Sequence, residues 1–265
     1  MKFWKHIAGL IRLNRAMVFV DYEYWFYSYR NLYGMKPDLA AWIEELRKEY
    51  CVADVRVFAD FSLAGLYDEK KKILAVTDSV QDTTEESVYR KKDMTDFVML
   101  DSLYQSVNKD RNIGTYILFT GDGHFSSVVK YITKKKRRKV VIYGVQESIS
   151  RRLQDCATKC VALPFATERF SAYRRMIIEN LAYVMDKSDI IPTFMGTVSA
   201  VVRKYDVNAG EVHTVLSDMI ARGLVVRKDH NVEFKRTIRI IAANWDKLIE
   251  EGYWDPIEQC VLERK

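Results

Sequence analysis

The 265-residue sequence lacks any uninterrupted apolar run of about 18 residues, the length that a membrane-spanning helix needs. Its basic N-terminus has only a short apolar stretch, which Arg12 interrupts, and no small-residue cleavage site follows. The four cysteines show no CxxC spacing, which favours reduced, mostly buried thiols. These absences exclude a membrane-spanning helix and a secretory signal, so we expect a cytoplasmic protein.

Internal repeats and low-complexity segments are also absent, and a chain of this length fits two domains. Hydrophobic residues make up 48% of the sequence, which is ample for a core of normal size. Residues 1–165 contain 27 Lys and Arg against 21 Asp and Glu, whereas residues 166–265 contain 15 of each kind. The net charge of +6 therefore belongs to the first part. This excess fits attraction to a polyanion or ordinary solubility, and charge alone does not separate them.

The first part alternates short apolar segments with amphipathic ones, which predicts a parallel sheet with right-handed crossovers and helices on both faces. The strands lack a clean alternation of apolar and polar residues, which fits burial on both sides. A polar region at 67–92 shows little periodicity. The expected strands are 16–21, 54–61, 115–120, 139–143 and 160–163, and the expected helices are 37–50, 95–108, 126–136 and 149–157. We predict this α/β domain over residues 16–165.

The C-terminal part, residues 168–265, predicts a smaller, mainly helical domain. A long helix at 168–187 precedes two further helices and a two-stranded ribbon at 224–234 with its turn near 229–231. This order is typical of a winged helix. The two helices are expected at 193–204 and 208–222, and a last one at 238–252. At the other end, residues 1–15 have amphipathic helical spacing, which favours docking on the first domain over a membrane-surface helix.

Aspartates follow three of the expected strands, and this placement points to chemistry. Asp21, Asp60 and Asp122 stand at or just after strand ends, and Asp96 opens the helix before the third. Because parallel strands end at one edge of a sheet, these carboxylates are expected to converge and to repel unless a cation neutralises them. Carboxylate oxygens suit Mg²⁺ or Mn²⁺, which activate water for attack on phosphoryl groups. The alternative is that each Asp only caps a helix.

Three segments resemble the signature segments of NYN domains, in the same order and at similar separations: VFVDY, KKDMTDFVMLDSLY and ILFTGDGHFSSVVKYI. VFADFS also resembles the second-strand segment of that family, and the match covers roughly residues 15–165. The resemblance implies a PIN-like fold and metal-dependent cleavage of RNA. It implies Asp21, Asp96 and Asp122 as catalytic metal ligands, and Thr120 as a hydroxyl that fixes the site. Gly121 and Gly123 would allow the turn that places Asp122.

The sequence departs from the family where a second acid often follows the Gly-Asp-Gly turn, because His124 stands there. His124 would contact a phosphate or shuttle a proton, and a surface turn histidine is the alternative. Asp60 is expected to support the site. Candidates for a missing fourth carboxylate are Asp93, Glu23 and Asp101, and Asp93 is preferred because it lies three residues before Asp96.

Substrate contacts are expected from two groups of residues. Arg90, Lys91 and Lys92 precede Asp96 and would contact the RNA backbone. Tyr22 and Tyr24 lie closest to Asp21 in a dense aromatic cluster of mixed spacing, which is more typical of packing but offers stacking on bases. The basic run at 134–139 is a candidate phosphate-contacting ridge, but a solvated face is favoured, because the helix starts at the active edge and so ends far from the metal.

These features predict a metal-dependent ribonuclease acting on single-stranded RNA. One alternative is a catalytically weak or inactive NYN-fold module that binds RNA or a partner. A haloacid dehalogenase-type phosphatase needs Asp-x-Asp, whereas this chain has Asp21, Tyr22 and Glu23. The neutral C-terminal part is expected to select substrate, to form an oligomer or to bind a protein partner.

Overall fold

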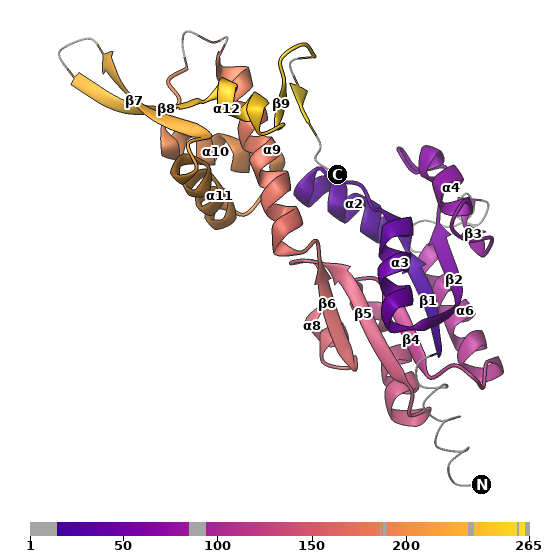
Figure 1. Ribbon diagram of the computed structural model, residues 1–265. Helices are drawn as coiled ribbons and strands as arrows, with labels where there is room; N and C mark the ends of the chain where they lie inside the picture. The colour runs from indigo at the N-terminus through magenta and orange to yellow at the C-terminus, as the bar shows by residue number, and fades with distance from the viewer. Residues whose placement is uncertain are drawn as a thin grey trace. The chain divides into compact units, whose positions relative to one another are not determined.

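The computed structural model describes residues 15–84, 94–185, 187, 190–232, 236–258 and 260–262. The chain divides into two compact units (Figure 1). The first contains the described residues within Met1–Tyr29 and Lys36–Leu163, and the second contains Arg30–Met35 and those within Pro164–Lys265. The helix expected at 1–15 lies outside the described residues, apart from Arg15, which begins a strand. No helix in the described ranges is long and apolar enough to cross a membrane.

The first unit is built on a six-stranded sheet in which every neighbouring pair of strands is parallel. The strands lie in the spatial order β3 (Val80–Asp82), β2 (Cys51–Ala59), β1 (Arg15–Asp21), β4 (Thr115–Phe119), β5 (Lys139–Val145) and β6 (Lys159–Leu163). Both central strands are buried along almost their whole length. This explains why their sequences are continuous apolar runs.

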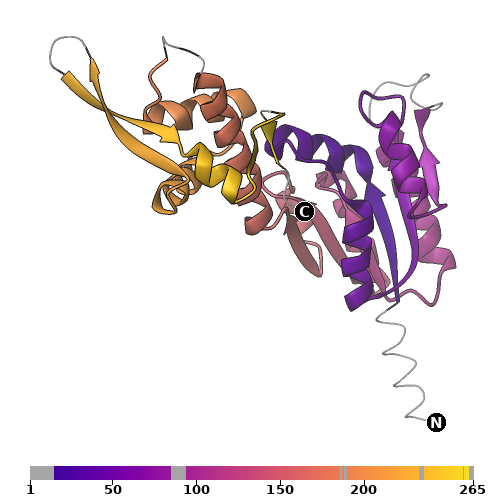
Figure 2. The same cartoon turned by 45° about the horizontal axis from the view of Figure 1, so that its top comes forward.

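Helices cover both faces of the sheet, as the sequence predicts (Figures 1 and 2). On one face, α6 (Met94–Lys109), α7 (Ser126–Lys130), the π-helical turn η2 (Tyr131–Lys135) and α8 (Arg151–Gln154) bury apolar side chains against the strands. On the other face, Trp25 of α2 (Tyr22–Tyr33) stacks on Phe119 with ring centroids 3.9 Å apart. Trp42 of α3 (Leu39–Glu49) packs edge-on against the same Phe119 ring.

Three elements of this unit were not predicted from the sequence. Helix α2 buries Tyr22, Trp25, Phe26, Tyr29 and Tyr33, whose spacing is helical, so the aromatic cluster was itself a missed helix signal. Helix α4 (Tyr67–Leu74) and strand β3 occupy the region expected to lack regular structure. Their signal is weak, because α4 buries only two side chains and β3 is a three-residue edge strand.

The second unit contains α9 (Ala166–Met185), α10 (Phe194–Tyr205) and α11 (Ala209–Ala221), followed by the antiparallel strands β7 (Val225–Val232) and β8 (Arg236–Ala243). A short helix, α12 (Trp245–Glu250), and a two-residue pair, β9 (Trp254–Asp255) with β10 (Cys260–Val261), complete it. The ribbon expected at 224–234 is wrong in extent, because β7 continues through residues 229–231, where the turn was expected. The helix expected at 238–252 is wrong in its first part, since residues 238–243 form β8, and only α12 lies within the expected range. An alternation of Ile238 and Ile240 with Thr237 and Arg239 was the strand signal.

Candidate metal centre

The site lies at the carboxyl edge of the sheet, between β1 and β4. From β1 the chain continues to β2 on one side, and from β4 it continues to β5 on the other, so the strand order reverses between these two strands. Open α/β sheets bind ligands outside such a switch point. Asp21 is the last residue of β1, and Thr120 and Asp122 follow β4 directly. The topology thus places the first and third predicted acids at the position where this fold forms binding sites.

Asp21 is a buried carboxylate with few hydrogen-bond donors. The whole residue is only 6% exposed to solvent. Oδ1 accepts the Tyr24 backbone N–H at 3.0 Å, and Oδ2 accepts a long hydrogen bond of 3.3 Å from the Thr120 hydroxyl. Burial, followed by the negative charge of Asp96, raises the pKa of Asp21 from 3.8 to about 8. In its ionised form, this side chain therefore requires a nearby positive charge.

The turn after β4 holds Asp122 in place. The Asp122 backbone N–H donates to Thr120 Oγ1 at 3.3 Å, and Asp122 Oδ1 accepts the His124 N–H at 2.8 Å. This second bond caps the one-turn 3-10 helix η1 (Gly123–Phe125). Gly121 is required because a Cβ atom there would lie 2.4 Å from both the Ser148 carbonyl oxygen and the Tyr24 hydroxyl. Gly121 therefore allows the turn to pack directly against Ser148 and Tyr24.

Side chains from two elements converge beside Asp21. One potential ligand atom from each of Asp96, Asp122 and His124 lies within 4.8 Å of the other two. His124 Nδ1 is 3.2 Å from Asp122 Oδ2, and its side chain is 75% exposed. Asp96 lies in the first turn of α6 and also acts electrostatically on Asp21. The structure thus groups Asp96 and Asp122 with His124 and places Asp21 within electrostatic reach of Asp96, and the carboxylate oxygens suit a small divalent cation.

Asp60 and Glu23 form a separate polar network next to this site. Asp60 is as buried as Asp21, and its Oδ1 accepts hydrogen bonds from Ser62 and from the Thr84 hydroxyl at 3.1 Å. Glu23 Oε1 accepts the Asp60 N–H at 2.6 Å and the Thr95 hydroxyl at 2.7 Å. Glu23 therefore braces the end of β2 against α6. From the sequence, Glu23 was only a candidate for a fourth carboxylate, and neither Thr95 as its partner nor Thr84 as a partner of Asp60 was identified.

The remaining acid candidates are outside the cluster or outside the described residues. Asp101 is exposed on α6 and accepts a hydrogen bond from Gln105 at 2.7 Å. Asp93, preferred from the sequence, falls in the undescribed residues 85–93, as do Arg90, Lys91 and Lys92. Their predicted roles remain predictions.

The predicted stacking of bases on Tyr22 is wrong, because this ring is 1% exposed. Its hydroxyl donates to Glu69 Oε2 at 3.1 Å, and burial is the largest cause that raises its pKa. Tyr24 is half-buried, and its hydroxyl accepts the Val145 N–H at 2.8 Å and bonds to Ser148. Burial raises the pKa of Tyr24 to about 12. Tyr22 therefore offers no ring face to a base, whereas stacking on the half-buried Tyr24 stays a prediction.

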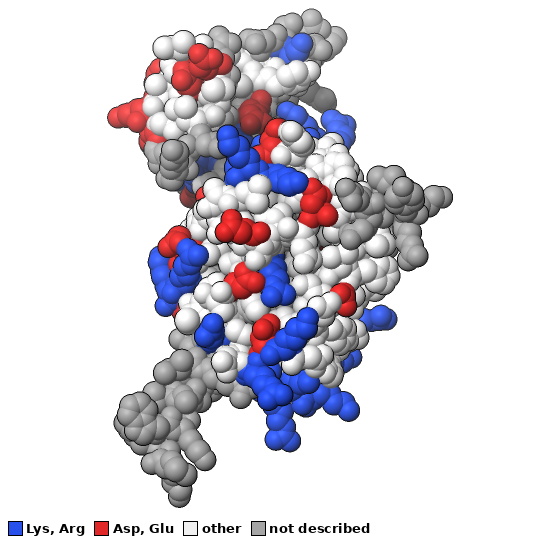
Figure 3. Space-filling view, turned by 90° about the vertical axis from the view of Figure 1, so that its right-hand side faces the viewer, with Lys and Arg blue, Asp and Glu red and all other residues white. Residues whose placement is uncertain are grey.

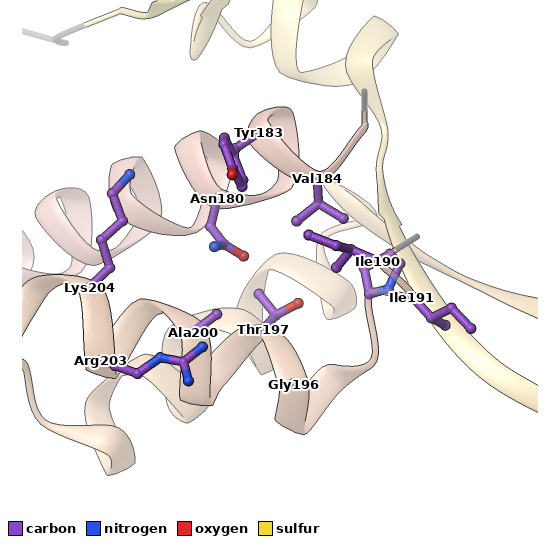
Figure 4. A pocket seen from close by; sticks show the side chains of 11 residues that line it. Asn180, Tyr183, Val184, Ile190, Ile191, Gly196, Thr197, Ala200, Arg203 and Lys204 are labelled. Atoms are coloured by element: carbon purple, nitrogen blue, oxygen red, sulfur yellow. The ribbon is translucent and has the colours of Figure 1, made fainter. Parts of the chain in front are cut away.

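A separate hollow of about 420 Å³ lies in the second unit, between α9 and α10 (Figure 4). Figure 4 shows Asn180 and Thr197 directed toward it from the two helices, with Arg203 and Lys204 farther along. None of the described residues that line it is acidic. It therefore provides no carboxylate for a cation, and the cluster at the sheet edge remains the candidate metal centre.

A family model described as "NYN domain" matches residues 15–164 of the chain. No curated protein matches it. Among solved structures, a protein of unknown function from Vibrio parahaemolyticus is similar, with 22% sequence identity and a TM-score of 0.48. That match covers 58% of this chain and 94% of the other.

Proposed function

Because the chain belongs to the NYN domain family, whose model matches residues 15–164, we propose that it is a metal-dependent ribonuclease. Its reaction is the hydrolysis of phosphodiester bonds in single-stranded RNA. Asp21, Asp96 and Asp122 are the proposed catalytic acids and ligands of Mg²⁺ or Mn²⁺. The family supports a nuclease-like fold, and the metal, the substrate and these roles are our proposal.

One observation carries this proposal: buried Asp21 lies at the switch point of the sheet within electrostatic reach of Asp96, which in turn clusters with Asp122 and His124. A carboxylate whose pKa is raised to about 8 by burial and by a second acid is unfavourable when ionised. A divalent cation removes that cost, because it neutralises the charges on both residues. The oxygen-rich ligands of the cluster fit Mg²⁺, and the exposed His124 ring adds a nitrogen that Mn²⁺ accepts more readily.

The chain's own residues position this chemistry. When bound, the cation supplies charge stabilisation for the phosphoryl group and activation of water. The Tyr24 N–H and the Thr120 hydroxyl hold the Asp21 oxygens, and the His124 N–H orients Asp122. The imidazole of His124 lies at the exposed side of the cluster, where it can donate a hydrogen bond to a phosphate oxygen.

His124 also supports a second candidate function, a module that binds RNA without cutting it. A histidine stands where an acid is frequent in the family, so the cluster contains one fewer negative charge to hold a cation. In this alternative, the carboxyl edge still binds RNA, but turnover is weak or absent.

For the second unit, we propose a winged-helix-like domain that selects substrate, forms an oligomer or binds a partner. The order α9, α10, α11, β7 and β8 supports this, as three helices followed by a two-stranded ribbon. Its 15 basic and 15 acidic residues in 166–265 argue against strong binding to nucleic acid by net charge.

The test is cleavage of a labelled single-stranded RNA with Mg²⁺ or Mn²⁺, by wild type and by the Asp21→Asn/Asp122→Asn variant. The wild type is expected to cut, EDTA to stop it, and the variant to be inactive. The control Asp78→Asn/Asp155→Asn removes the same charge from two exposed acids and is expected to cut normally. Binding without cleavage under both metals would establish the non-catalytic alternative, and equal cleavage of single-stranded DNA would refute the preference for RNA.

A further inference from the structure

Basic side chains from separate segments of the first unit meet at the amino edge of the sheet, opposite the carboxylates. The register places them together, because Gly114 N–H donates to the Arg15 carbonyl and Lys139 N–H donates to the Gly114 carbonyl. We call this group the basic edge. Its members are Arg15, Lys109, Arg111, Lys134, Lys135, Lys136, Arg137, Arg138 and Lys139. Figure 3 shows Lys and Arg side chains gathered at the lower end of this unit.

The charges of the basic edge are not neutralised by the described acids. None of its nine side chains forms an ion pair with an acid in the described ranges, whereas nearby Arg47 and Lys48 on α3 pair with Glu44 and Glu45. Seven of the nine are exposed, and Lys136 and Arg138 are half-buried. Such a concentration of unpaired positive charge attracts a polyanion.

Part of the basic edge is held by hydrogen bonds and lies next to aromatic rings. Lys136 Nζ donates to Asn108 Oδ1 at 2.8 Å and lies 5.3 Å from the centre of the Tyr131 ring. Arg138 donates to the Tyr116 hydroxyl at 2.9 Å. The Tyr104 ring, with its residue 36% exposed, lies 5.5 Å from that of Tyr131. Cations beside partly exposed rings favour the binding of single-stranded RNA, because its bases stack on the rings while its phosphates bind the cations.

Two helices connect the basic edge to the metal centre. Helix α6 begins at Met94, beside Asp96, and ends at Lys109, while α7 and η2 run from the turn after Asp122 to Lys135. With 16 residues, α6 is about 24 Å long, at roughly 1.5 Å per residue. A stacked strand that advances about 3.4 Å along its axis per phosphate would cover this length with roughly seven phosphates.

One face of α6 follows this path. Phe97, Asp101, Tyr104 and Asn108 recur at helical spacing, and Phe97 is 62% exposed. Asp101 is the acid on this face, and its carboxylate is engaged by Gln105. Between the carboxyl edge and the basic edge, this face of α6 thus presents the aromatic side chains of Phe97 and Tyr104 and the amide of Asn108.

We propose that the basic edge binds the RNA backbone roughly seven nucleotides away from the bond that is cut. One strand would then run along α6, from the basic edge to the carboxylates. This inference rests on the proposed function, and for the run 134–139 it favours contact with phosphates over a solvated face. It implies that the enzyme prefers substrates long enough to reach both edges.

The test compares Lys135→Gln/Arg137→Gln with Arg47→Gln/Lys48→Gln in the full-length protein. Each variant removes one lysine and one arginine, but both side chains of the control pair already form ion pairs, with Glu44 and Glu45. Binding is measured with EDTA, on single-stranded RNAs of about 12 and about 3 nucleotides, across salt concentrations. For the longer RNA, we expect the Lys135/Arg137 variant to bind roughly tenfold more weakly, with a salt slope reduced by about 1.4. The control and the short RNA are expected to be unaffected.

Cleavage provides the second readout. With the longer RNA, the Lys135/Arg137 variant is expected to raise KM about tenfold and leave kcat unchanged, since the carboxylates are intact. Equal binding of the longer RNA by this variant and its control would overturn the inference, even if the protein is an active ribonuclease. Weakened binding in a protein that never cuts would support the basic edge and refute the ribonuclease. Loss of binding to anionic lipid vesicles, with RNA binding unchanged, would assign the surface to a membrane and overturn it too.

Discussion

Asp21 and Asp60 are equally buried aspartates at the carboxyl ends of neighbouring strands, yet their surroundings differ. Each residue is 6% exposed. Asp60 accepts hydrogen bonds from the Ser62 N–H, the Ser62 hydroxyl and the Thr84 hydroxyl. Asp21 accepts one backbone N–H and one long hydroxyl bond, and it faces the charge of Asp96.

The difference shows that burial alone does not identify a functional acid. A buried carboxylate with several donors is compensated by the fold and braces it. A buried carboxylate placed opposite another acid needs a proton or a cation. By this criterion, the end of β2 is structural, and the switch point between β1 and β4 is the candidate metal centre.

The largest expected effect comes from exchanging each aspartate for asparagine. Asp21→Asn is expected to lower the rate of RNA cleavage about a thousandfold, because it removes a ligand of the cation. Asp60→Asn keeps an oxygen for its donors and is expected to change the rate less than about tenfold. Single-turnover cleavage measures both. An Asp60→Asn variant that melts normally but is as inactive as Asp21→Asn would break the comparison.

The second prediction concerns stability without metal. The pKa of Asp21 is raised from 3.8 to about 8, so its contribution to stability is complete below about 3.8 and is lost as the pH rises toward about 8. At pH 7, Asp21→Asn is therefore expected to stabilise the metal-free fold by a few kcal/mol. Thermal melts in EDTA should show a gap that widens from about pH 5 to about pH 8 and then stays constant.

Metal addition provides the control for this prediction. Mn²⁺ is expected to raise the melting temperature of the wild type more than that of Asp21→Asn, since bound ligand stabilises the folded state. A wild type that melts above the variant at every pH in EDTA would show that ionised Asp21 is compensated within the protein.

The third prediction concerns the turn that positions Asp122. Gly121→Ala is expected to destabilise the protein by about 2 kcal/mol, because its Cβ would meet the Ser148 carbonyl and the Tyr24 hydroxyl. Displacement of Asp122 should also lower cleavage up to about a hundredfold. Gly210→Ala is the control, since its Cβ would meet only Asn208 Oδ1, at 3.2 Å. Equal behaviour of the two variants in melts and cleavage would show that the turn has room for a side chain.

The smallest effect is expected at His124, on the exposed side of the cluster. His124→Asp adds a carboxylate and should tighten Mn²⁺ binding roughly tenfold, while His124→Ala should weaken it by a few-fold. Titration of the protein with Mn²⁺ measures both changes. Unchanged affinity in both variants would place the imidazole outside the coordination sphere.

Much of the first unit could be predicted because buried parallel strands have a strong sequence signal. The strands around Phe19, Ile117 and Ile142 are continuous apolar runs, and each appears close to its predicted position. The short β3 and α4 could not be predicted, because they bury few side chains. In the second unit, β8 was mistaken for a helix because its alternating pattern is only partly buried.

The acids of the site could be predicted from the sequence, because strand ends converge in a parallel sheet whatever the details of packing. The roles of the neighbouring polar residues could not be predicted. Whether Glu23 holds a cation or braces the backbone depends on which donors reach it, and these come from residues 37 and 72 positions along the chain. The tyrosines following Asp21 were ambiguous for the same reason, since sequence spacing does not say which ring faces solvent.

The pairing of β1 with β4 also affects when the site can form. Ala16 lies opposite Thr115, so about a hundred residues separate strands that are neighbours in the sheet. Closing so long a loop is slow, because chain entropy is lost before the contacts form. During synthesis, Asp21 emerges long before Asp122, and the carboxylates meet only after β4 has joined β1. The candidate metal centre therefore cannot form until β4 is in place, and the proposed cleavage of RNA would have to wait for that step.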